Sequence, residues 1–338
     1  MTEQSGGSVN ATFGSVAAPV MATAEAVDGA FGPVRVGALE PFHLHPFAHV
    51  LHYASTCFEG VKAHRGPDGV VRLFRPDRHV ARMRRTAARM SLPVPSEDLL
   101  MGMIRDVVVA NLDAVPPAPG ALYVRPLLFG TEPNIGAAAS PSGTAMLAVL
   151  ASPVGDYFAG GVRPLTLLLE TDLPRTTPQF GEVKAGANYA MALGLTLHAR
   201  QELGCDQVLF APGGVVQETG AANFLLLAED RIVTPPLDST FLHGVTRDSV
   251  LTLARDRGLA VEERPVPVAE LLAWSAEAAL SGTAATLSGV GALLHRDGRH
   301  VIGSGEVGPV TLGLRDGLMA VQRGEAEDVH GWTVPVTA

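Results

Sequence analysis

The strongest constraint on the fold is an interruption of the secondary-structure pattern at residues 152–161. Pro153, Gly155 and the pair Gly160-Gly161 break a stretch that has regular strand and helix patterns on both sides. The chain has 338 residues, and a single hydrophobic core stops growing at about 250–300 residues. The sequence therefore predicts two domains. The expected boundaries are a disordered lead over 1–12, a small α/β domain over 13–152, a linker over 153–163 and a larger domain over 164–338.

Local patterns in both parts predict a mixed α/β chain. Residues 70–74 alternate after a Gly/Pro turn, as a strand does, whereas residues 75–90 have helical spacing. Ser96 is the expected cap of the next helix, which should reach about Asn111. Residues 13–37, broken by Gly, Ala and Pro, are expected to be loosely structured. The remaining expected elements are strands within 50–75 and at 121–130, 144–151, 165–170, 207–210, 215–217 and 223–228, and helices at 188–203 and from 244.

The composition excludes several classes of function. A formal net charge of −9 and a pI near 5.6 argue against nucleic acid or an anionic membrane as a partner. No apolar run approaches the ~20 residues that cross a bilayer, and no signal peptide is apparent, so we expect a cytoplasmic protein. The two cysteines, Cys57 and Cys205, form no metal-binding spacing. Four histidines crowd residues 43–52 without an HExxH motif, and we expect no metal site.

Lys184 is the first candidate for chemistry because lysine is rare in this chain. There are two lysines, Lys62 and Lys184, among the 25 lysines and arginines. A guanidinium stays protonated and does not readily form a Schiff base, whereas a desolvated ε-amine does. Small residues flank Lys184 and leave room for a bulky partner. This flank predicts the lysine of a pyridoxal-phosphate enzyme, with an ordinary surface lysine as the alternative. Lys62 lacks such a flank and is expected to lack nearby partners.

A pyridoxal-phosphate enzyme also needs an anion site for the phosphate and a partner for the pyridine nitrogen. Residues 244–248 are expected to open a helix, whose N-terminal N–H groups attract anions, and Thr246 adds a hydroxyl. Ser281-Gly282-Thr283 offers similar chemistry. Glu218 is the candidate that would keep the pyridine nitrogen protonated. Each of these features has an ordinary alternative, which is a helix cap or a surface turn.

Seven short motifs occur in the order seen in class IV aminotransferases. They are Phe58-Glu59-Gly60, Tyr123-Val124-Arg125-Pro126, Gly130-Thr131-Glu132-Pro133, residues 184–189, residues 218–223, residues 244–247 and Ser281-Gly282-Thr283-Ala284. Over roughly residues 13–334 the chain closely resembles the branched-chain amino acid aminotransferases, in particular the longer subgroup with mitochondrial and actinobacterial members. The resemblance implies a fold-type-IV α/β enzyme, with a small two-layer domain and a larger pseudo-barrel domain. It also implies a homodimer.

The resemblance implies pyridoxal 5′-phosphate as the cofactor and assigns residues to it. Lys184 would form the Schiff base and, once released, carry the proton between the substrate α-carbon and the cofactor. Glu218 would pair with the pyridinium nitrogen, and Tyr189 would hydrogen-bond the phenolic oxygen. The residues expected at the phosphate are Arg82, Val245, Thr246 and Thr283.

The implied reaction is a ping-pong transamination between L-leucine, L-isoleucine or L-valine and 2-oxoglutarate, or the reverse. The partners would be these small amino acids and 2-oxo acids. Tyr123 and the backbone at Ala284 would meet the substrate carboxylate, and Arg125 the second carboxylate of glutamate. The residues expected to line an apolar side-chain pocket are Tyr53, Phe58 and Tyr157.

Two departures from the family pattern leave the substrate open. Residues 175–180 replace the usual Arg-Ala-Trp and glycine-rich segment, and Ala221 stands where many relatives have a hydroxyl. A specialised member of secondary metabolism, acting on a related aliphatic or aromatic 2-oxo acid, is therefore an alternative. D-amino acid aminotransferase and aminodeoxychorismate lyase are further alternatives, although the Tyr123 and Arg125 pair favours the L-branched-chain type. A Schiff-base aldolase without a cofactor is the alternative from another mechanistic class.

Overall fold

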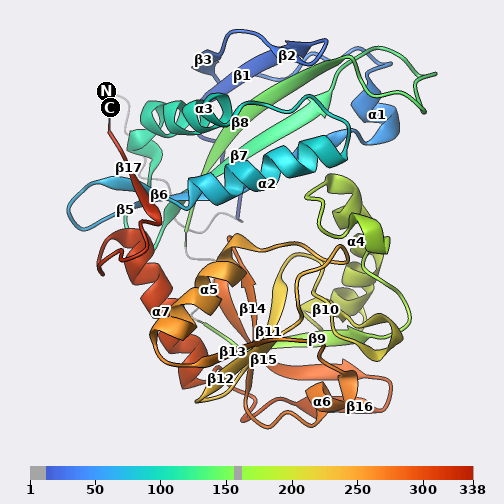
Figure 1. Cartoon of the computed structure of the whole chain (residues 1–338), viewed down its shortest axis with the longest axis vertical. Helices are drawn as coiled ribbons and strands as arrows, with labels where there is room; N and C mark the ends of the chain where they lie inside the picture. The colour runs from blue at the N-terminus through green and yellow to red at the C-terminus, as the bar shows by residue number, and fades with distance from the viewer. Residues whose placement is uncertain (1–12, 156–161, 338) are drawn as a thin grey trace.

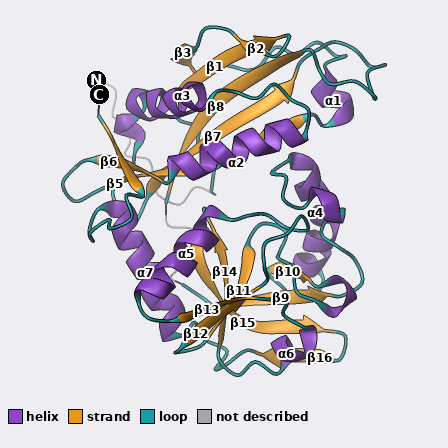
Figure 2. Cartoon of the chain, viewed as in Figure 1, coloured by secondary structure: helices purple, strands orange, loops and turns teal. Residues whose placement is uncertain are grey.

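The computed structural model describes residues 13–155 and 162–337, and it is built on two β-sheets (Figure 1). The expected lead over 1–12 and most of the expected linker, including Tyr157, lie outside the described residues. One sheet occupies the upper part of Figure 1 and the other the lower part, with helices on the outer faces and between them (Figure 2). The fold is the expected mixed α/β arrangement with two sheets.

The first sheet has nine strands within the described residues, in the order β17-β6-β5-β7-β8-β1-β2, with β3 beside β1 and β4 beside β7. Its strands are β1 (Val20–Val27), β2 (Ala30–Phe31), β3 (Arg35–Ala38), β4 (Thr56–Phe58), β5 (Val61–Arg65), β6 (Val71–Phe74), β7 (Ala121–Gly130), β8 (Thr144–Val154) and β17 (Thr333–Val336). The helices of this part are α1 (His49–Tyr53), α2 (Pro76–Arg89) and α3 (Glu97–Ala110).

Helices α2 and α3 form where the spacing predicted them. The inward face of α2 buries Val80, Met83 and Ala87 against the first sheet, as a helical repeat of apolar residues requires. The Ser96 side chain accepts a hydrogen bond of 3.2 Å from the backbone N–H of Leu99, so it is the N-cap of α3.

The expectation of loose structure over residues 13–37 was wrong. Strand β1 pairs with β8 along its length and buries Ala22, Ala24 and Ala26 on alternate positions. Asn111, at the end of α3, fastens the start of β1, because its side chain both accepts from the N–H of Val20 and donates to its carbonyl. Alanine has low strand propensity, so this strand depends on tertiary packing that local sequence does not reveal.

The second sheet has eight strands within the described residues, in the order β10-β9-β15-β14-β11-β12-β13, with β16 beside β15. Its strands are β9 (Leu165–Glu170), β10 (Gln207–Phe210), β11 (Asn223–Leu227), β12 (Arg231–Thr234), β13 (Ala260–Glu263), β14 (Glu277–Gly282), β15 (Thr286–His295) and β16 (Gly298–Val301). Its helices are α4 (Gly186–Gln201), α5 (Val245–Asp256), α6 (Val268–Leu272) and α7 (Pro309–Arg323).

Residues 215–217 form single bridges instead of the regular strand expected there. The N–H of Gln217 donates to the carbonyl of Phe210 at 2.9 Å, beside β10, and the N–H of Val216 donates to the carbonyl of Val266 at 2.9 Å, just past β13. This segment therefore connects the two ends of the strand order and curls the sheet toward a barrel. The strands expected within 50–75 were also wrong at their start, because residues 49–53 form helix α1.

The end of the chain returns to the first sheet. Strand β17 pairs antiparallel with β6, so residues 333–336 do not belong with the second sheet, as an assignment of all of 164–338 to one domain would require. The other domain boundaries stay predictions. Among the helices of the described residues, none combines the length and apolar character needed to cross a membrane.

Candidate active site

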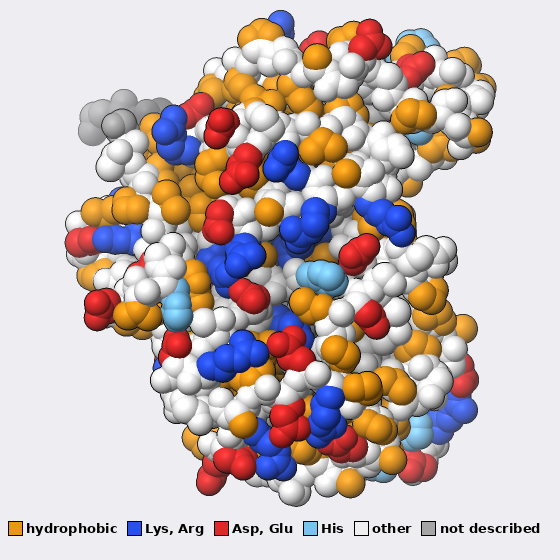
Figure 3. Space-filling view, viewed as in Figure 1, with side chains coloured by type: hydrophobic (Ala, Val, Ile, Leu, Met, Phe, Trp, Pro, Cys, Tyr) orange, Lys and Arg blue, Asp and Glu red, His pale blue; other side chains and the backbone are white. Residues whose placement is uncertain are grey.

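A cavity of about 360 Å³ opens between the two sheets and collects nearly all the predicted site residues. The first sheet and α2 contribute Phe58, Arg82, Tyr123 and Arg125 to its wall. The second half contributes Lys184, Tyr189, Glu218, Val245, Thr246, Thr283 and Ala284. Positive side chains gather on the surface where the upper and lower parts of the molecule meet (Figure 3). Residues separated by more than two hundred positions in the sequence thus share one site.

Lys184 lies directly before α4, and its amine points at the first turn of that helix. Its Nζ donates to the hydroxyl of Tyr189 at 3.0 Å and lies 5.1 Å from the ring centre of Phe58. The N–H of Phe58 donates to the carbonyl of Lys184 at 3.1 Å, which fastens the lysine backbone to β4 of the first sheet. The amine is therefore held at the junction of the two sheets, beside a phenol and an aromatic face.

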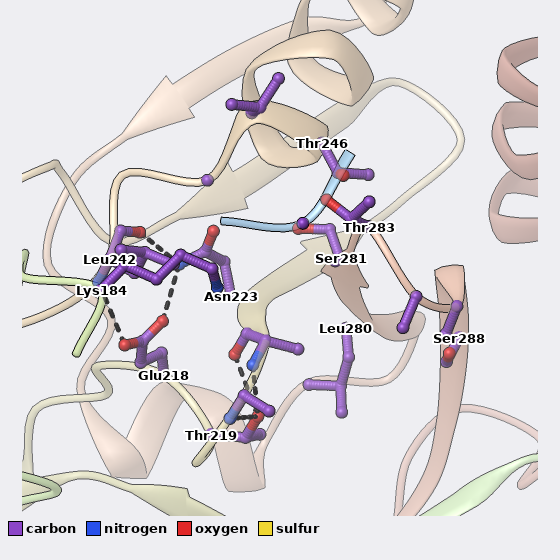
Figure 4. Close-up of a pocket in the computed structure, with 18 of the residues that line it drawn as sticks. Lys184, Glu218, Thr219, Asn223, Leu242, Thr246, Leu280, Ser281, Thr283 and Ser288 are labelled. Carbon is purple, nitrogen blue, oxygen red and sulfur yellow. Dashed lines mark hydrogen bonds between the residues drawn. The ribbon is translucent and has the colours of Figure 1, made fainter. Parts of the chain in front are cut away.

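Glu218 is a buried carboxyl with three donors around it. Its Oε1 accepts from Arg175 at 2.7 Å and from the N–H of Leu242 at 3.1 Å, and its Oε2 accepts from the side-chain amide of Asn223 at 2.9 Å (Figure 4). Burial raises the pKa of Glu218 to about 7, while the charge of Arg175 acts in the opposite direction. A cation placed against this carboxyl would favour its charged form. A protonated pyridine nitrogen is such a cation.

An anion site lies at the N-terminus of α5. Gly244 is the N-cap and offers no side-chain oxygen to the first N–H groups of the helix, and the hydroxyls of Thr246 and Thr283 lie on this side of the cavity (Figure 4). The Ser281 hydroxyl is buried and has no hydrogen-bond partner among the described residues. Unpaired N–H and O–H donors together with the helix dipole suit a phosphate.

Gly244 is required by its surroundings. A Cβ at this position would lie 2.0 Å from the side-chain oxygen of Asn223, which is the residue that also holds Glu218. The phosphate site and the buried carboxyl are therefore linked through one asparagine.

Arg82 reaches the cavity from α2 and is fixed by buried partners. Its Nε and one terminal nitrogen donate to the two oxygens of Glu59 at 2.6 and 2.9 Å, and its other terminal nitrogen donates to the carbonyl of His243 at 2.9 Å. Burial alone would raise the pKa of Glu59. However, the charge and hydrogen bonds of Arg82, together with a hydrogen bond from His79, hold that pKa well below its usual range. The arginine is thus oriented before any ligand binds.

Tyr123 and Arg125 face the cavity from neighbouring inward positions of β7. The guanidinium of Arg125 donates to the Tyr123 hydroxyl at 3.1 Å and lies 4.5 Å from the ring centre of Phe58. The Tyr123 hydroxyl lies against Gly60, where a Cβ would be 1.9 Å away. Glycine at position 60 therefore sets where the tyrosine can stand.

Tyr53, expected in the apolar pocket, does not line the cavity. It lies in α1, and its hydroxyl donates to the carbonyl of Ile135 in a neighbouring loop. The local motif around Tyr53 gave its identity but not its distance from Lys184. Tyr157, expected beside it, lies outside the described residues.

Three features of the site were missed from the sequence. Lys62 was expected to lack partners, yet its amine donates to the carbonyl of Ala284 at 2.7 Å, on the cavity wall. Arg175 was noted only as part of a divergent segment, and it is the ion-pair partner of Glu218. Glu59 was quoted within a motif but given no role. Charged residues beside recognised motifs were the available signal.

The residues present fit pyridoxal 5′-phosphate. The cavity offers a lysine amine, a buried carboxyl deep in the wall and an anion site with a free hydroxyl at Ser281. A lysine, a carboxyl and a phosphate site between two α/β sheets define a pyridoxal-phosphate enzyme of fold type IV.

Comparison with known proteins places the chain within that class. Residues 56–293 match the model of the family described as amino-transferase class IV. The branched-chain-amino-acid aminotransferase of Mycolicibacterium smegmatis is 38% identical, over 90% of this chain and 86% of that protein. The Mycobacterium tuberculosis protein of the same name is 39% identical, over 88% and 84%. The chain belongs to the class IV aminotransferases and, within them, to the branched-chain-amino-acid aminotransferases.

Solved structures agree in fold. The Escherichia coli branched-chain amino acid aminotransferase has a TM-score of 0.76 and 27% identity, over 95% of this chain and all of that one. The Thermobaculum terrenum enzyme, in its PLP-bound form, has a TM-score of 0.77 and 25% identity, over 95% of this chain and 99% of that one. These relatives do not favour the specialised, D-amino acid, lyase or aldolase alternatives.

Proposed function

We propose that this chain transfers amino groups between L-leucine, L-isoleucine or L-valine and 2-oxoglutarate, with pyridoxal 5′-phosphate as cofactor. The observation that carries the proposal is the meeting of Lys184, Tyr189 and Glu218 in one cavity with Arg125. Its relatives bear the branched-chain name. One solved relative is complexed with N-(5′-phosphopyridoxyl)-L-glutamate and another with 4-methylvaleric acid, which are an acidic and a branched apolar ligand.

The residues that would hold the cofactor divide into two groups. Arg82, Thr246 and Thr283, with the N–H of Val245, would bind the phosphate, because they combine positive charge, hydroxyls and a helix N-terminus. Glu218 would face the pyridine nitrogen. When bound there, the cofactor supplies an electron sink for the carbanion that forms when the substrate α-proton leaves.

Lys184 would carry the proton in this reaction. Its amine is the one titratable base among the described cavity residues that lies beside Tyr189, and the hydrogen bond between them fixes where the amine points. Tyr189 donates or accepts as the lysine changes charge, because a phenol can do both. Lys184 would thus remove the proton from the substrate α-carbon and return it one step later.

One substrate site would serve both an apolar and an acidic side chain. The Phe58 ring offers an apolar face, and the Arg125 guanidinium lies over the same ring, ready to meet a second carboxylate. Tyr123 and the backbone at Ala284 would hold the α-carboxylate. Two substrates that use one site in turn give ping-pong kinetics.

We also propose a cytoplasmic homodimer. Helix α4 presents Met191, Leu193 and Leu197 with 54%, 53% and 41% exposure, and such an apolar row next to the Lys184 segment suits burial against a second copy. Both cysteines are buried free thiols, which suits a reducing compartment. Light scattering of the purified enzyme tests the dimer, and a monomer at micromolar concentration would contradict it.

A half-reaction panel tests the substrate proposal. Purified enzyme with bound cofactor is mixed with L-leucine, L-isoleucine, L-valine, L-glutamate, L-phenylalanine and D-forms, and the cofactor absorbance is followed. We expect fast conversion by the three branched L-amino acids and L-glutamate and slow conversion by D-forms. No conversion by the branched L-amino acids, with cofactor bound, would overturn the substrate proposal and leave the fold and cofactor intact.

A further inference from the structure

The hairpin of β15 and β16 brings two histidines and an aspartate together, away from the active site. In this antiparallel pair, His295 lies opposite Gly298 and His300 lies opposite Leu293. Side chains at positions 293, 295, 298 and 300 share one face of the hairpin, so the two imidazoles are diagonal neighbours. Asp297 is in the turn between them. The pattern His-x-Asp-x-x-His across a tight turn therefore gathers three side chains that can ligate a metal.

The three side chains already direct one atom each at a common point. The Nδ1 of His295 lies 2.9 Å from the Oδ1 of Asp297, and the Nε2 of His300 lies 2.7 Å from the same oxygen. The three candidate donor atoms lie within 4.8 Å of one another. Tetrahedral ligands at 2.0–2.1 Å from zinc are separated by about 3.4 Å. A shift of roughly half an ångström at Asp297 would admit the ion.

The charges around the hairpin permit a cation. The carboxyl of Asp297 accepts hydrogen bonds from His300 and His295, which lower its pKa to about 2, so it is an anion at neutral pH. Arg296 is engaged by Asp172, and Arg299 pairs with Leu294 and so lies on the opposite face of the hairpin. The side chains of His295 and His300 are only partly exposed, at 19% and 27%, which limits the entropy lost when they are fixed.

We propose that His295, Asp297 and His300 bind a divalent first-row transition metal of the zinc type, with water completing the coordination. Two imidazoles and one carboxylate suit zinc, nickel and copper and do not suit magnesium or calcium. Binding clamps the β15–β16 hairpin at its turn. The site is independent of the transamination proposed above, because β15 meets the cavity at its other end, at Ser288.

Zinc binding to the complete cofactor-loaded enzyme tests the proposal. Isothermal titration with zinc chloride, after removal of adventitious metal, should give one saturable site per chain. His300→Ala and His295→Ala should each weaken that site by at least roughly tenfold, since even an outer ligand partner contributes 10–100-fold. Affinity should fall as pH decreases, because protons compete for the imidazoles. Cobalt as a second probe should give visible bands in the wild type and lose them in both variants.

His330→Ala is the matched control. His330 also lies against a carboxylate, with its Nε2 2.7 Å from Asp256, but without a second histidine. This variant should keep the zinc site unchanged, and all three variants should keep the wild-type transamination rate and circular dichroism. Absence of saturable zinc binding in the folded wild type, or equal binding by wild type and His300→Ala, would overturn the proposal.

Discussion

The two lysines of this chain differ in chemistry because different atoms meet their amines. The Lys62 amine donates to a backbone carbonyl, that of Ala284, which only accepts and so favours the protonated amine. The Lys184 amine meets the hydroxyl of Tyr189, which can donate or accept. A reactive lysine must change its charge during the reaction, and only Lys184 has a partner that allows this. The assignment therefore rests on the partner atoms as well as on position.

Glu218→Gln removes the negative charge facing the cofactor while keeping the side-chain shape. We expect the variant to bind cofactor but to react about 10–100-fold more slowly, since a hydrogen bond to a charged group contributes about 1.5–3 kcal/mol. Stopped-flow half-reactions normalised to bound cofactor measure this. Glu202→Gln, at the exposed end of α4, is the control and should match the wild type. Weak cofactor binding with an unchanged rate per bound site would contradict the role given to Glu218.

Gly60→Ala places a methyl group where the Tyr123 hydroxyl stands. Because the new Cβ would lie 1.9 Å from that oxygen, Tyr123 must move and its contact with the substrate carboxylate should be lost. We expect KM for the amino donor to rise by roughly tenfold, as for a lost hydrogen bond of about 1.4 kcal/mol, with cofactor binding little changed.

Gly102→Ala is its control. Gly102 lies inside α3 with nothing within 4 Å of the added Cβ, so alanine should leave KM unchanged and stabilise the helix slightly. An unchanged KM in Gly60→Ala would show that Tyr123 does not set carboxylate binding.

At the scale of elements, sequence periodicity predicted helices well and some strands poorly. Helices α2 and α3 carry apolar residues at helical spacing and a serine cap, and both form there. Strand β1 has alanines inside and Thr or Glu outside, so its alternation carries little hydrophobic contrast, and its order comes from β8 and α3. The final strand, β17, pairs with β6 about 260 residues earlier, and no local pattern encodes such a partner.

The candidate site was predictable where residues belong to compact motifs. Lys184, Tyr189 and Glu218 were found from their flanks and the family resemblance, and the structure brings them into one cavity. Arg175 could not be assigned to Glu218 from the sequence, because 42 intervening positions fold back through α4 and β10 before the pair forms. Tyr53 was misplaced for the same reason, since a motif does not fix a distance.

Helix α5 should hold the cofactor phosphate through its first turn. Thr246→Val keeps the volume of the side chain and removes one donor, so we expect the dissociation constant of the cofactor to rise by about five- to tenfold, equivalent to about 1 kcal/mol. Thr252→Val on the same helix is the control, because its hydroxyl donates to the carbonyl of Asp248 and does not line the cavity. Equal cofactor affinity in the two variants would contradict a phosphate site at this turn.

At the scale of the whole molecule, one buried histidine should make stability depend on pH. His64 in β5 is buried, and neither ring nitrogen has a hydrogen-bond partner among the described residues. Burial, with the nearby charges of Lys62 and Arg323, lowers the pKa of His64 to about 3. The unfolded chain takes up a proton on this ring below about pH 6.5, whereas the folded chain stays neutral there. Acid therefore favours the unfolded state.

We expect His64 to remove about 2 kcal/mol from the free energy of unfolding between about pH 7.5 and about pH 5. Denaturant unfolding of wild type and His64→Leu at both pH values measures this. The variant should lose about 2 kcal/mol less than the wild type over the same interval. Equal losses in the two proteins would contradict a neutral buried imidazole at this position.

The measurement that tests the central claim most directly is chemical mapping of the cofactor lysine. Borohydride fixes a lysine Schiff base irreversibly, and with two lysines in the chain the peptide mass identifies which one was joined. We predict that the pyridoxyl group is found on Lys184, that Lys184→Ala abolishes both the adduct and turnover, and that Lys62→Ala keeps the adduct. An adduct on Lys62, or appreciable turnover in Lys184→Ala, would contradict the account.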